Sequence, residues 1–371
     1  MTDIEYDSEY VWHPYAALGD GAAKRLVKSA SGLELELDDG RKLIDAVSSW
    51  WCVAHGHNHP HIVEAMRRQS EKLCHVMFGG LTHGPAIELA RRLKGILPAG
   101  LDKVFFADSG SISVEVAAKM AIQYQTALGR PWRNRIVALK GAYHGDTSLA
   151  MALSDPDGMH TLFKGIMTKH FFADKPACPF GGEWAEGAAA SLEKILAEHE
   201  GEIAAVICEP VFQAANAMNF YHPRYLREMR RLCDEIASAF MHGPTYMANP
   251  LACSAAIASL ELFEGGGYAE RVKRIEGELR EGLSPLEGAP NVKNVRVLGA
   301  AGVVEVERLP SREDISRVID ECGVWLRPFS NYIYAMPPLV SGSADISRIT
   351  AAMREMARCP PGPEDLSGFH E

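Results

Sequence analysis

A strand–turn–helix pattern at residues 103–119 constrains the fold of this chain more than any other stretch. The apolar run Val104–Ala107 predicts a short buried strand, and residues 111–119 repeat small and apolar side chains at helical spacing. The turn between them, Asp-Ser-Gly-Ser at 108–111, contains a glycine that lets the backbone approach a ligand. Free N–H groups, hydroxyls and the positive end of a helix dipole meet there, which indicates an anion site, although an ordinary strand-to-helix connection explains the turn equally well.

Two further apolar runs predict buried strands, at Arg135–Leu139 and Ile203–Cys208. Strict alternation at Leu33–Leu37, an Asp-Gly turn and residues 42–46 together predict a hairpin. From about residue 268 the chain alternates charged helical stretches with short strands, which predicts a second, smaller α/β unit. Strands that alternate with helices in this way define an α/β fold class.

Charge and cysteine usage exclude several classes of function. The net charge is -10 and the sequence pI is about 5.8, so the overall field repels nucleic acid and anionic membranes. The first residues are acidic and polar rather than those of a signal peptide, and no apolar run reaches the length of a membrane span. The eight cysteines are scattered without a Cys-x-x-Cys pair, which is typical of the reducing cytoplasm.

Two loops carry side chains that could bind a metal ion or a ligand. Residues 55–61 alternate histidines around Asn and Pro, which suggests a metal site, but a capped helix start explains them better because no cysteine or carboxylate completes the set. We therefore expect no metal. The loop after the strand at 135–139 brings Tyr143 to a strand's carboxyl end, where ligands of open α/β sheets bind. Packing of Tyr143 beneath the loop is the competing interpretation.

Seven motifs together resemble the class III pyridoxal-phosphate aminotransferases, and they run through nearly the whole chain. They are Trp12–Tyr15, Ser48–Trp51, His75–Gly80, Ala107–Ser111, Tyr143–Asp146, Met241–Thr245 and Arg327–Phe329. The resemblance implies a fold-type I transferase, with a large domain built on a mostly parallel sheet and a smaller α/β domain formed by both chain ends. Residues 1–55 would form the N-terminal arm and part of the small domain, residues 56–264 the large cofactor-binding domain, and residues 265–371 the C-terminal part of the small domain.

The resemblance also implies that pyridoxal 5'-phosphate is the cofactor. Gly110 and Ser111 would hold its phosphate, and Tyr143 would stack on its pyridine ring. Glu209, at the end of the strand that begins at Ile203, would be the acidic residue that the family keeps near the cofactor.

Other residues would act on the substrate or across a subunit boundary. Arg327 would pair with a substrate carboxylate through a two-pronged contact that lysine cannot reproduce, and Tyr15 and Trp51 would line the substrate pocket. Plain core packing is the alternative for Trp51. A loop would reach the phosphate of the partner subunit's cofactor, which implies a homodimer with shared sites. The residues of that loop are Gly243, Pro244 and Thr245.

One departure from the family changes the chemical expectation. The family carries a long segment between the helix that ends near Cys233 and the Met241–Thr245 loop, and this segment holds the Schiff-base lysine and the aspartate beneath the pyridine ring. Here Cys233 is separated from Met241 by only seven residues, and no lysine occurs between Lys194 and Lys273. Residues 234–237 echo the aspartate motif, but a helix rather than a strand precedes them. The large-domain sheet is therefore expected to be truncated, and no catalytic lysine is available.

Within the family, the tryptophan pair and the Met-His-Gly-Pro-Thr loop are typical of a branch that acts in biotin synthesis. That branch transfers an amino group from S-adenosylmethionine to 8-amino-7-oxononanoate. The competing hypothesis is a truncated homologue that binds the cofactor but is catalytically inactive, since it lacks the lysine. A general class III aminotransferase for ornithine or another ω-amine is a third hypothesis, which the tryptophan pair disfavours.

Overall fold

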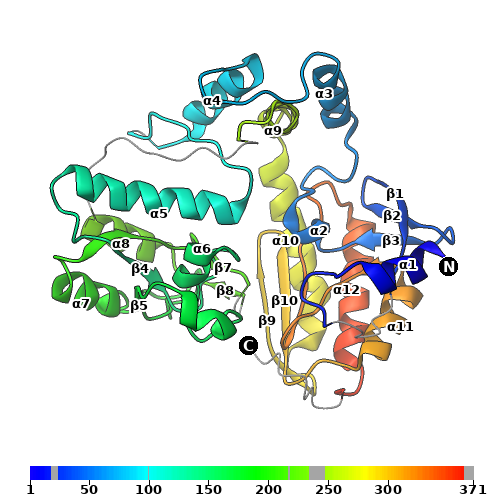
Figure 1. Ribbon diagram of the computed structural model, residues 1–371. Coiled ribbons are helices and arrows are strands. Elements are labelled where there is room, and N and C mark those ends of the chain that lie inside the picture. The colour runs from blue at the N-terminus through cyan, green and yellow to red at the C-terminus, as the bar shows by residue number, and fades with distance from the viewer. Residues whose placement is uncertain (18–23, 99, 216–217, 234–246, 363–371) are drawn as a thin grey trace. The chain divides into compact units, whose positions relative to one another are not determined.

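The structure is a computed structural model, shown in Figure 1, and it describes residues 1–17, 24–98, 100–215, 218–233 and 247–362. Contacts divide the chain into two units. Unit 1 combines residues 1–68 with the residues from 255 on, and unit 2 consists of residues 69–254. Two stretches far apart in sequence thus build one unit. The three domain ranges expected from the family resemblance stay a prediction.

The first sheet of unit 1 explains why both parts of the chain are needed. It has the strand order β1 (Val27–Ser31), β2 (Glu34–Leu37), β3 (Lys42–Asp45) and β11 (Val324–Trp325). The predicted hairpin is confirmed, because β2 and β3 pair antiparallel with Leu35 opposite Leu43. Strand β11 then joins β3 in parallel, which ties the C-terminal residues to the N-terminal hairpin.

The second sheet of unit 1 carries the larger hydrophobic core. Its order is β12 (Tyr332–Ala335), β10 (Ala301–Val306) and β9 (Val292–Leu298), and the helices α10 (Tyr268–Leu283) and α12 (Ser343–Arg358) pack against it (Figure 1). Leu279, Val304 and Ile349 are completely buried between these layers. Burying each such side chain stabilises the fold by about 1.5–3 kcal/mol.

Helix boundaries in unit 1 follow local capping chemistry. The predicted helix at 311–322 is confirmed as α11 (Arg312–Cys322), where the Ser311 hydroxyl accepts a hydrogen bond from the Asp314 N–H group. Gly323 ends the helix in the left-handed conformation, with φ at 63°. The predicted helix at 268–283 is α10, and Gly267 precedes it, also left-handed.

Among its described residues, unit 2 has a parallel sheet of three strands in the order β5 (Phe171–Ala173), β4 (Arg135–Leu139) and β6 (Ile203–Val206). The strand predicted at 135–139 is confirmed, and the one predicted at 203–208 ends two residues earlier. Helices α5 (Gly110–Ala127) and α6 (Ser148–Leu153) pack against β6 and β4, and α7 (Ala190–Glu198) packs against β5. The carboxyl ends of all three strands therefore lie along one edge of the sheet.

Two predictions for unit 2 are wrong. Residues Val104–Ala107 form no strand, and all four are only half-buried. A strand is stabilised by its ladder partners, and these residues have no place in the β5–β4–β6 order. The helix predicted over 184–199 begins only at Ala190, because Gly187 adopts a left-handed backbone with φ at 80° just before it.

The other elements connect these layers. In chain order they are α1 (Asp3–Tyr10), α2 (Ser48–Trp51), α3 (Pro60–Ser70), α4 (Gly84–Ile96), the 3-10 helix Thr161–Ile166, β7 (Phe212–Gln213), β8 (Asn219–Phe220), α8 (Arg224–Cys233), α9 (Pro250–Glu264) and the 3-10 helix Ser284–Leu286. Within the described part of the chain, no helix has both the length and the apolar character that crossing a membrane requires.

Candidate active site

The N-terminus of α5 has the geometry that binds an anion. Ser109 is its N-cap, and the Ser109 hydroxyl accepts a hydrogen bond of 3.2 Å from the N–H group of Ile112. The N–H groups of Gly110 and Ser111 have no acceptor among the described residues. A Cβ atom added to Gly110 would meet no atom within 4 Å, so the space beside the first residue of the helix is open. The start of an 18-residue helix adds its positive dipole end.

The loop after β4 is held tightly against this helix start. The N–H group of Asp146 donates a hydrogen bond of 3.1 Å to the hydroxyl of Ser111. Gly145 has φ at +123°, and a Cβ atom there would lie 2.2 Å from the Ser111 hydroxyl oxygen and 2.9 Å from the Ser111 Cα. Position 145 therefore requires glycine both for its backbone conformation and for this close approach.

Tyr143 belongs to a cluster that the sequence did not reveal. Its phenolic hydroxyl donates a 2.9 Å hydrogen bond to the Asp146 carboxylate, and its ring stacks on His160 with 6.0 Å between centroids. The Nε2 atom of His160 lies 2.9 Å from the other oxygen of Asp146. The carboxylate of Asp146 thus joins both rings and fixes their orientation. Only the short spacing of Tyr143 and Asp146 could have indicated this, and nothing marked His160.

Glu209 joins the cluster from the end of β6. Its two carboxylate oxygens accept hydrogen bonds from the N–H groups of Tyr143, at 3.3 Å, and Ala214, at 3.4 Å. Burial raises the pKa of Glu209 to about 7, and these two hydrogen bonds offset only part of that effect. The structure therefore brings together four of the predicted cofactor residues, Gly110, Ser111, Tyr143 and Glu209, through a chain of direct contacts.

The raised pKa of Glu209 predicts a pH-dependent stability. As the pH rises from 4.5, the ordinary pKa of a glutamate, to about 7, the unfolded chain releases the proton before the folded chain does. The free energy of unfolding should therefore fall over this range, by up to about 3 kcal/mol. Glu209→Gln should remove this component, whereas the exposed Glu186→Gln should keep it. Urea unfolding of the unchanged protein, Glu209→Gln and Glu186→Gln at pH 4.5, 6 and 7.5 measures this. If the stability of Glu209→Gln depends on pH as that of the unchanged protein does, the prediction is wrong.

Lys140 lies beside this cluster but is not suited to attack a carbonyl. Its ammonium group is 2.9 Å from the carboxylate of Asp174, and about half of the side chain is exposed. The hydrogen bond to Asp174 raises the pKa of Lys140, so the amine is held in its protonated, non-nucleophilic form. The structure thus supplies no reason to assign Lys140 the role of the missing lysine.

Three of the four histidines at 55–61 make separate structural contacts through their side chains. His55 bonds to the hydroxyls of Tyr268 and Ser259, His57 to the carboxylate of Asp45, and His61 to that of Glu261. Pro60 is the first residue of α3, as a helix start at this point requires. Among the described residues, no group of three or more His, Cys, Asp or Glu side chains is placed to hold a metal ion.

In unit 1, two of the three predicted substrate residues, Arg327 and Tyr15, contact Trp50, the chain neighbour of the third, Trp51. The Arg327 guanidinium lies 5.2 Å from the centre of the Trp50 ring, and the ring of Tyr15 meets Trp50 edge-on at 6.1 Å. Trp51 packs edge-on against Tyr334 at 6.4 Å. Arg327 is exposed and forms no ion pair with any described carboxylate, so its charge is available to a ligand. Trp50, which the sequence analysis did not assign, is the centre of this group.

The tryptophan pair is presented by an unusual backbone. All four residues of α2, Ser48–Trp51, have positive φ, at 47°, 45°, 60° and 69°, so they form one turn of left-handed helix. Left-handed conformation costs about 1–2 kcal/mol for each such residue. The completely buried carboxylate of Asp45 accepts hydrogen bonds from the Val47 N–H group, the Ser49 hydroxyl and His57. Three bonds to a charged acceptor, at about 1.5–3 kcal/mol each, are of the size needed to offset that cost.

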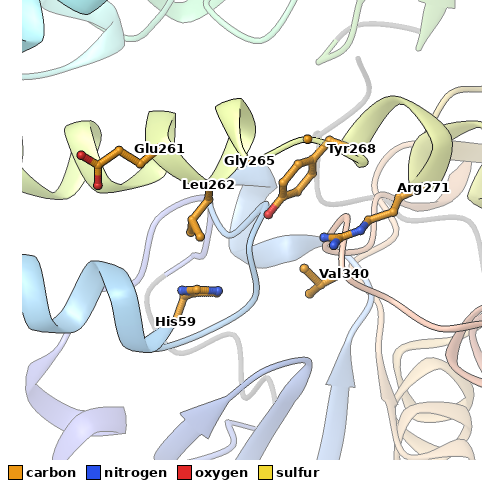
Figure 2. A pocket seen from close by; sticks show the side chains of 8 residues that line it. His59, Glu261, Leu262, Gly265, Tyr268, Arg271 and Val340 are labelled. Carbon is orange, nitrogen blue, oxygen red and sulfur yellow. The ribbon is translucent and has the colours of Figure 1, made fainter.

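A separate cavity of about 600 Å³ lies at the junction of α9 and α10 in unit 1, and Figure 2 shows it. Arg271 stacks on the Tyr268 ring at 4.7 Å, and Glu261 is paired with His61. The cavity shares no residue with the group around Trp50. Its lining residues are His59, Glu261, Leu262, Gly265, Gly266, Tyr268, Arg271 and Val340.

Some predicted residues cannot be placed. Gly243, Pro244 and Thr245, expected to contact the partner subunit's cofactor, lie outside the described residues, as does Asp234. Within the described part, the residues fit the phosphate and the ring of pyridoxal phosphate. Open N–H donors face the phosphate position, and an aromatic ring and a carboxylate lie beside them. For its covalent attachment, Lys140 is unsuited because Asp174 holds its amine protonated.

Fold and site together define a pyridoxal-phosphate transferase of fold type I. The family model "Aminotransferase class-III" matches residues 15–241 and 234–357, so the chain belongs to the class III aminotransferases. A solved structure of adenosylmethionine-8-amino-7-oxononanoate aminotransferase from Methanocaldococcus jannaschii superposes with a TM-score of 0.86 at 26% identity, covering 95% of this chain and 98% of that one.

Curated relatives carry the same name. The protein of Buchnera aphidicola subsp. Schizaphis graminum is 39% identical over 92% of this chain and 93% of its own length. That of Corynebacterium glutamicum is 38% identical over 94% and 97%. The first alignment extends over 403 positions although 92% of this chain's 371 residues is about 341, so about 60 positions hold no residue of this chain. The two family matches meet at 234–241, where the sequence predicted a missing segment.

Proposed function

We propose that this chain carries the cofactor and acceptor sites of the aminotransferase that converts 8-amino-7-oxononanoate to 7,8-diaminononanoate in biotin synthesis, with S-adenosylmethionine as amino donor, and that turnover requires the lysine-bearing segment that the chain lacks between Cys233 and Met241. The support is the family membership and the shared name of relatives at 38–39% identity over more than nine-tenths of the chain. The observation within the structure that carries the proposal is Arg327 on the face of Trp50, where no described carboxylate pairs with it; this suits an acceptor with a terminal carboxylate.

Unit 2 would bind and orient pyridoxal phosphate. Gly110 and Ser111 would donate their N–H groups to the phosphate, and the ring of Tyr143, held by Asp146, would lie on the pyridine. When bound, the cofactor supplies an electron sink and a carrier for the amino group. Glu209, with its pKa near 7, would hold or release a proton beside Tyr143 close to neutral pH.

Unit 1 would bind the substrate. Arg327 would bind the acceptor's carboxylate through two parallel hydrogen bonds, with its guanidinium kept in plane by stacking on Trp50. Tyr15 and Trp51 would form the walls along the acceptor's hydrocarbon chain. The amine that transfers the proton would come from the lysine-bearing segment that the chain lacks between Cys233 and Met241.

Assembly and location follow from the same proposal. Gly243, Pro244 and Thr245 would contact the cofactor of the partner subunit in a homodimer, so that each site uses both chains. The cytoplasm would be the site of action, which agrees with eight cysteines that form no disulfide among the described residues. The names of the relatives assign these sites to that enzyme, and the missing lysine leaves the present chain without turnover until the segment is restored.

Arg327→Lys tests the assignment of the acceptor. Lysine keeps the charge but loses the two-pronged contact, so the dissociation constant of 8-amino-7-oxononanoate should rise by about 10- to 150-fold, the equivalent of about 1.5–3 kcal/mol. Calorimetric titration of both proteins measures this, with the methyl ester of the acceptor as the matched ligand without a carboxylate. Equal affinity of the two proteins for the free acid would show that Arg327 is structural.

A further inference from the structure

The left-handed turn Ser48–Trp51 is strained, and its strain needs an explanation. Four consecutive residues with positive φ are rare when none is glycine, and such outliers concentrate where they serve a site. Each end of the turn is anchored. The Ser48 hydroxyl donates a 2.5 Å hydrogen bond to the Met336 carbonyl, and the N–H group of Cys52 bonds to the Ser48 carbonyl at 2.8 Å. These contacts fix the position of the turn without explaining its hand.

Asp45 is the residue that acts on the inside of the turn. It is the last residue of β3, its side chain is completely buried, and it accepts hydrogen bonds from Val47 at 3.2 Å and Ser49 at 2.7 Å. Both donors belong to the chain segment that enters the left-handed conformation. The carboxylate therefore ties the entry of the left-handed turn to the end of the strand.

His57 holds the carboxylate itself. Its Nε2 atom lies 2.9 Å from Asp45, and its side chain is only 13% exposed. The backbone of His57 exchanges two hydrogen bonds with Gly32, at 2.7 Å and 3.0 Å. A Cβ atom on the neighbouring Gly56 would lie 2.9 Å from the Gly32 carbonyl, so this approach leaves the histidine little freedom. Asp45 is thus clamped between a fixed histidine and the turn.

We propose that Asp45 is a positioning residue for carboxylate recognition: by holding Ser48–Trp51 left-handed, it presents the face of Trp50 to Arg327. The Trp50 ring is the surface on which the guanidinium lies, at 5.2 Å, and no described carboxylate orients Arg327 from another side. If the turn reverts to a right-handed or extended backbone, the ring leaves this position and Arg327 loses its support. The inference rests on the proposed function of Arg327 and deepens it.

The test compares Asp45→Asn with Asp39→Asn, a matched change at an exposed aspartate of the same hairpin. Asparagine keeps the size of the side chain but replaces one acceptor oxygen by a donor. We expect Asp45→Asn to weaken binding of 8-amino-7-oxononanoate at least tenfold in calorimetry, with no change for its methyl ester or for pyridoxal phosphate. Asp39→Asn should match the unchanged protein in all three titrations.

A rescue variant separates positioning from general stability. Glycine adopts positive φ without cost, so adding Ser49→Gly to Asp45→Asn should recover most of the lost affinity if the carboxylate acts by holding the turn. Failure of rescue, or an affinity of Asp45→Asn equal to that of the unchanged protein, would overturn the proposal. If Asp45→Asn unfolds, Ser49→Ala provides the test, because it removes one hydrogen-bond donor to Asp45. It should lower the affinity for 8-amino-7-oxononanoate two- to fivefold, and an unchanged affinity would overturn the proposal.

The same titrations separate this inference from the proposed function. If the unchanged protein binds the free acid and its methyl ester equally well, the assignment of Arg327 fails, and with it the proposed acceptor. If it prefers the acid but Asp45→Asn retains that preference, only the role of Asp45 fails. The fluorescence of Trp50 provides a second measure, and it is obtained by subtracting the spectrum of Trp50→Phe from that of the unchanged protein. In Asp45→Asn without ligand, its intensity should change because the stack of Arg327 on Trp50 is lost.

Discussion

Insertion of the family's lysine-bearing segment between Cys233 and Met241 should create an enzyme that makes 7,8-diaminononanoate, whereas the present chain should give no turnover above the blank. The reason is chemical: a general acid–base group contributes about 10²- to 10⁴-fold to rate, and here the same amine also attaches the cofactor. Lys140, which precedes the loop of Tyr143, is held protonated by Asp174. We therefore expect a difference of at least about a hundredfold.

The measurement is product formation from S-adenosylmethionine and 8-amino-7-oxononanoate, followed by mass spectrometry, for both proteins at equal concentration of bound cofactor. The control is the extended protein with its inserted lysine changed to alanine, which should fall to the level of the present chain. Turnover by the present chain within tenfold of the extended one would mean that another amine replaces the lysine.

Gly145→Ala should abolish tight binding of pyridoxal phosphate. The new Cβ atom would lie 2.2 Å from the Ser111 hydroxyl oxygen and 2.9 Å from the Ser111 Cα, and φ at +123° is itself unfavourable for alanine. The loop after β4 or the start of α5 must move, and both carry cofactor residues. Overpacking of this kind typically costs about 1–3 kcal/mol of stability, and we expect the cofactor's affinity to fall at least a hundredfold.

Gly110→Ala is the matched control for Gly145→Ala. A Cβ atom at position 110 meets no atom within 4 Å, and alanine is favourable at the start of a helix, so the urea midpoint should not fall. Because the open space there is the position assigned to the phosphate, the affinity for pyridoxal phosphate should still decrease. Unchanged affinity in Gly110→Ala would place the phosphate elsewhere, and unchanged affinity and stability in Gly145→Ala would contradict the close packing of the loop on α5.

Local sequence patterns predicted the elements whose bounds depend mainly on their own residues. The helix at 268–283 and the strand at Arg135–Leu139 have the predicted bounds, because periodicity and composition determine them within a few residues. The strand predicted at Val104–Ala107 failed for the opposite reason. A strand exists only with ladder partners, and the order β5–β4–β6 gives these residues none. An apolar run alone does not show whether a neighbouring strand is there to pair with it.

The site was predictable where one short motif holds the chemistry. The helix start at Gly110 and Ser111 and the loop at Tyr143 could be recognised from sequence, and the structure joins them to Glu209. The placement of His160 against Asp146 depends on the path of the intervening chain. The left-handed turn was equally hidden, since no glycine marks Ser48–Trp51. Its cause is a buried carboxylate at Asp45, whose burial only the folded sheet establishes.

Reduction with borohydride in the presence of pyridoxal phosphate tests the central claim most directly. The claim is that this chain holds the cofactor site of a class III aminotransferase without the lysine that attaches the cofactor. After digestion and mass spectrometry, the extended protein should yield one pyridoxyl-lysine peptide, from the inserted segment, at near-stoichiometric amount. The present chain should bind the cofactor but yield no such peptide. A near-stoichiometric pyridoxyl-lysine in the present chain would contradict the claim, and its position would identify the lysine that replaces the missing one.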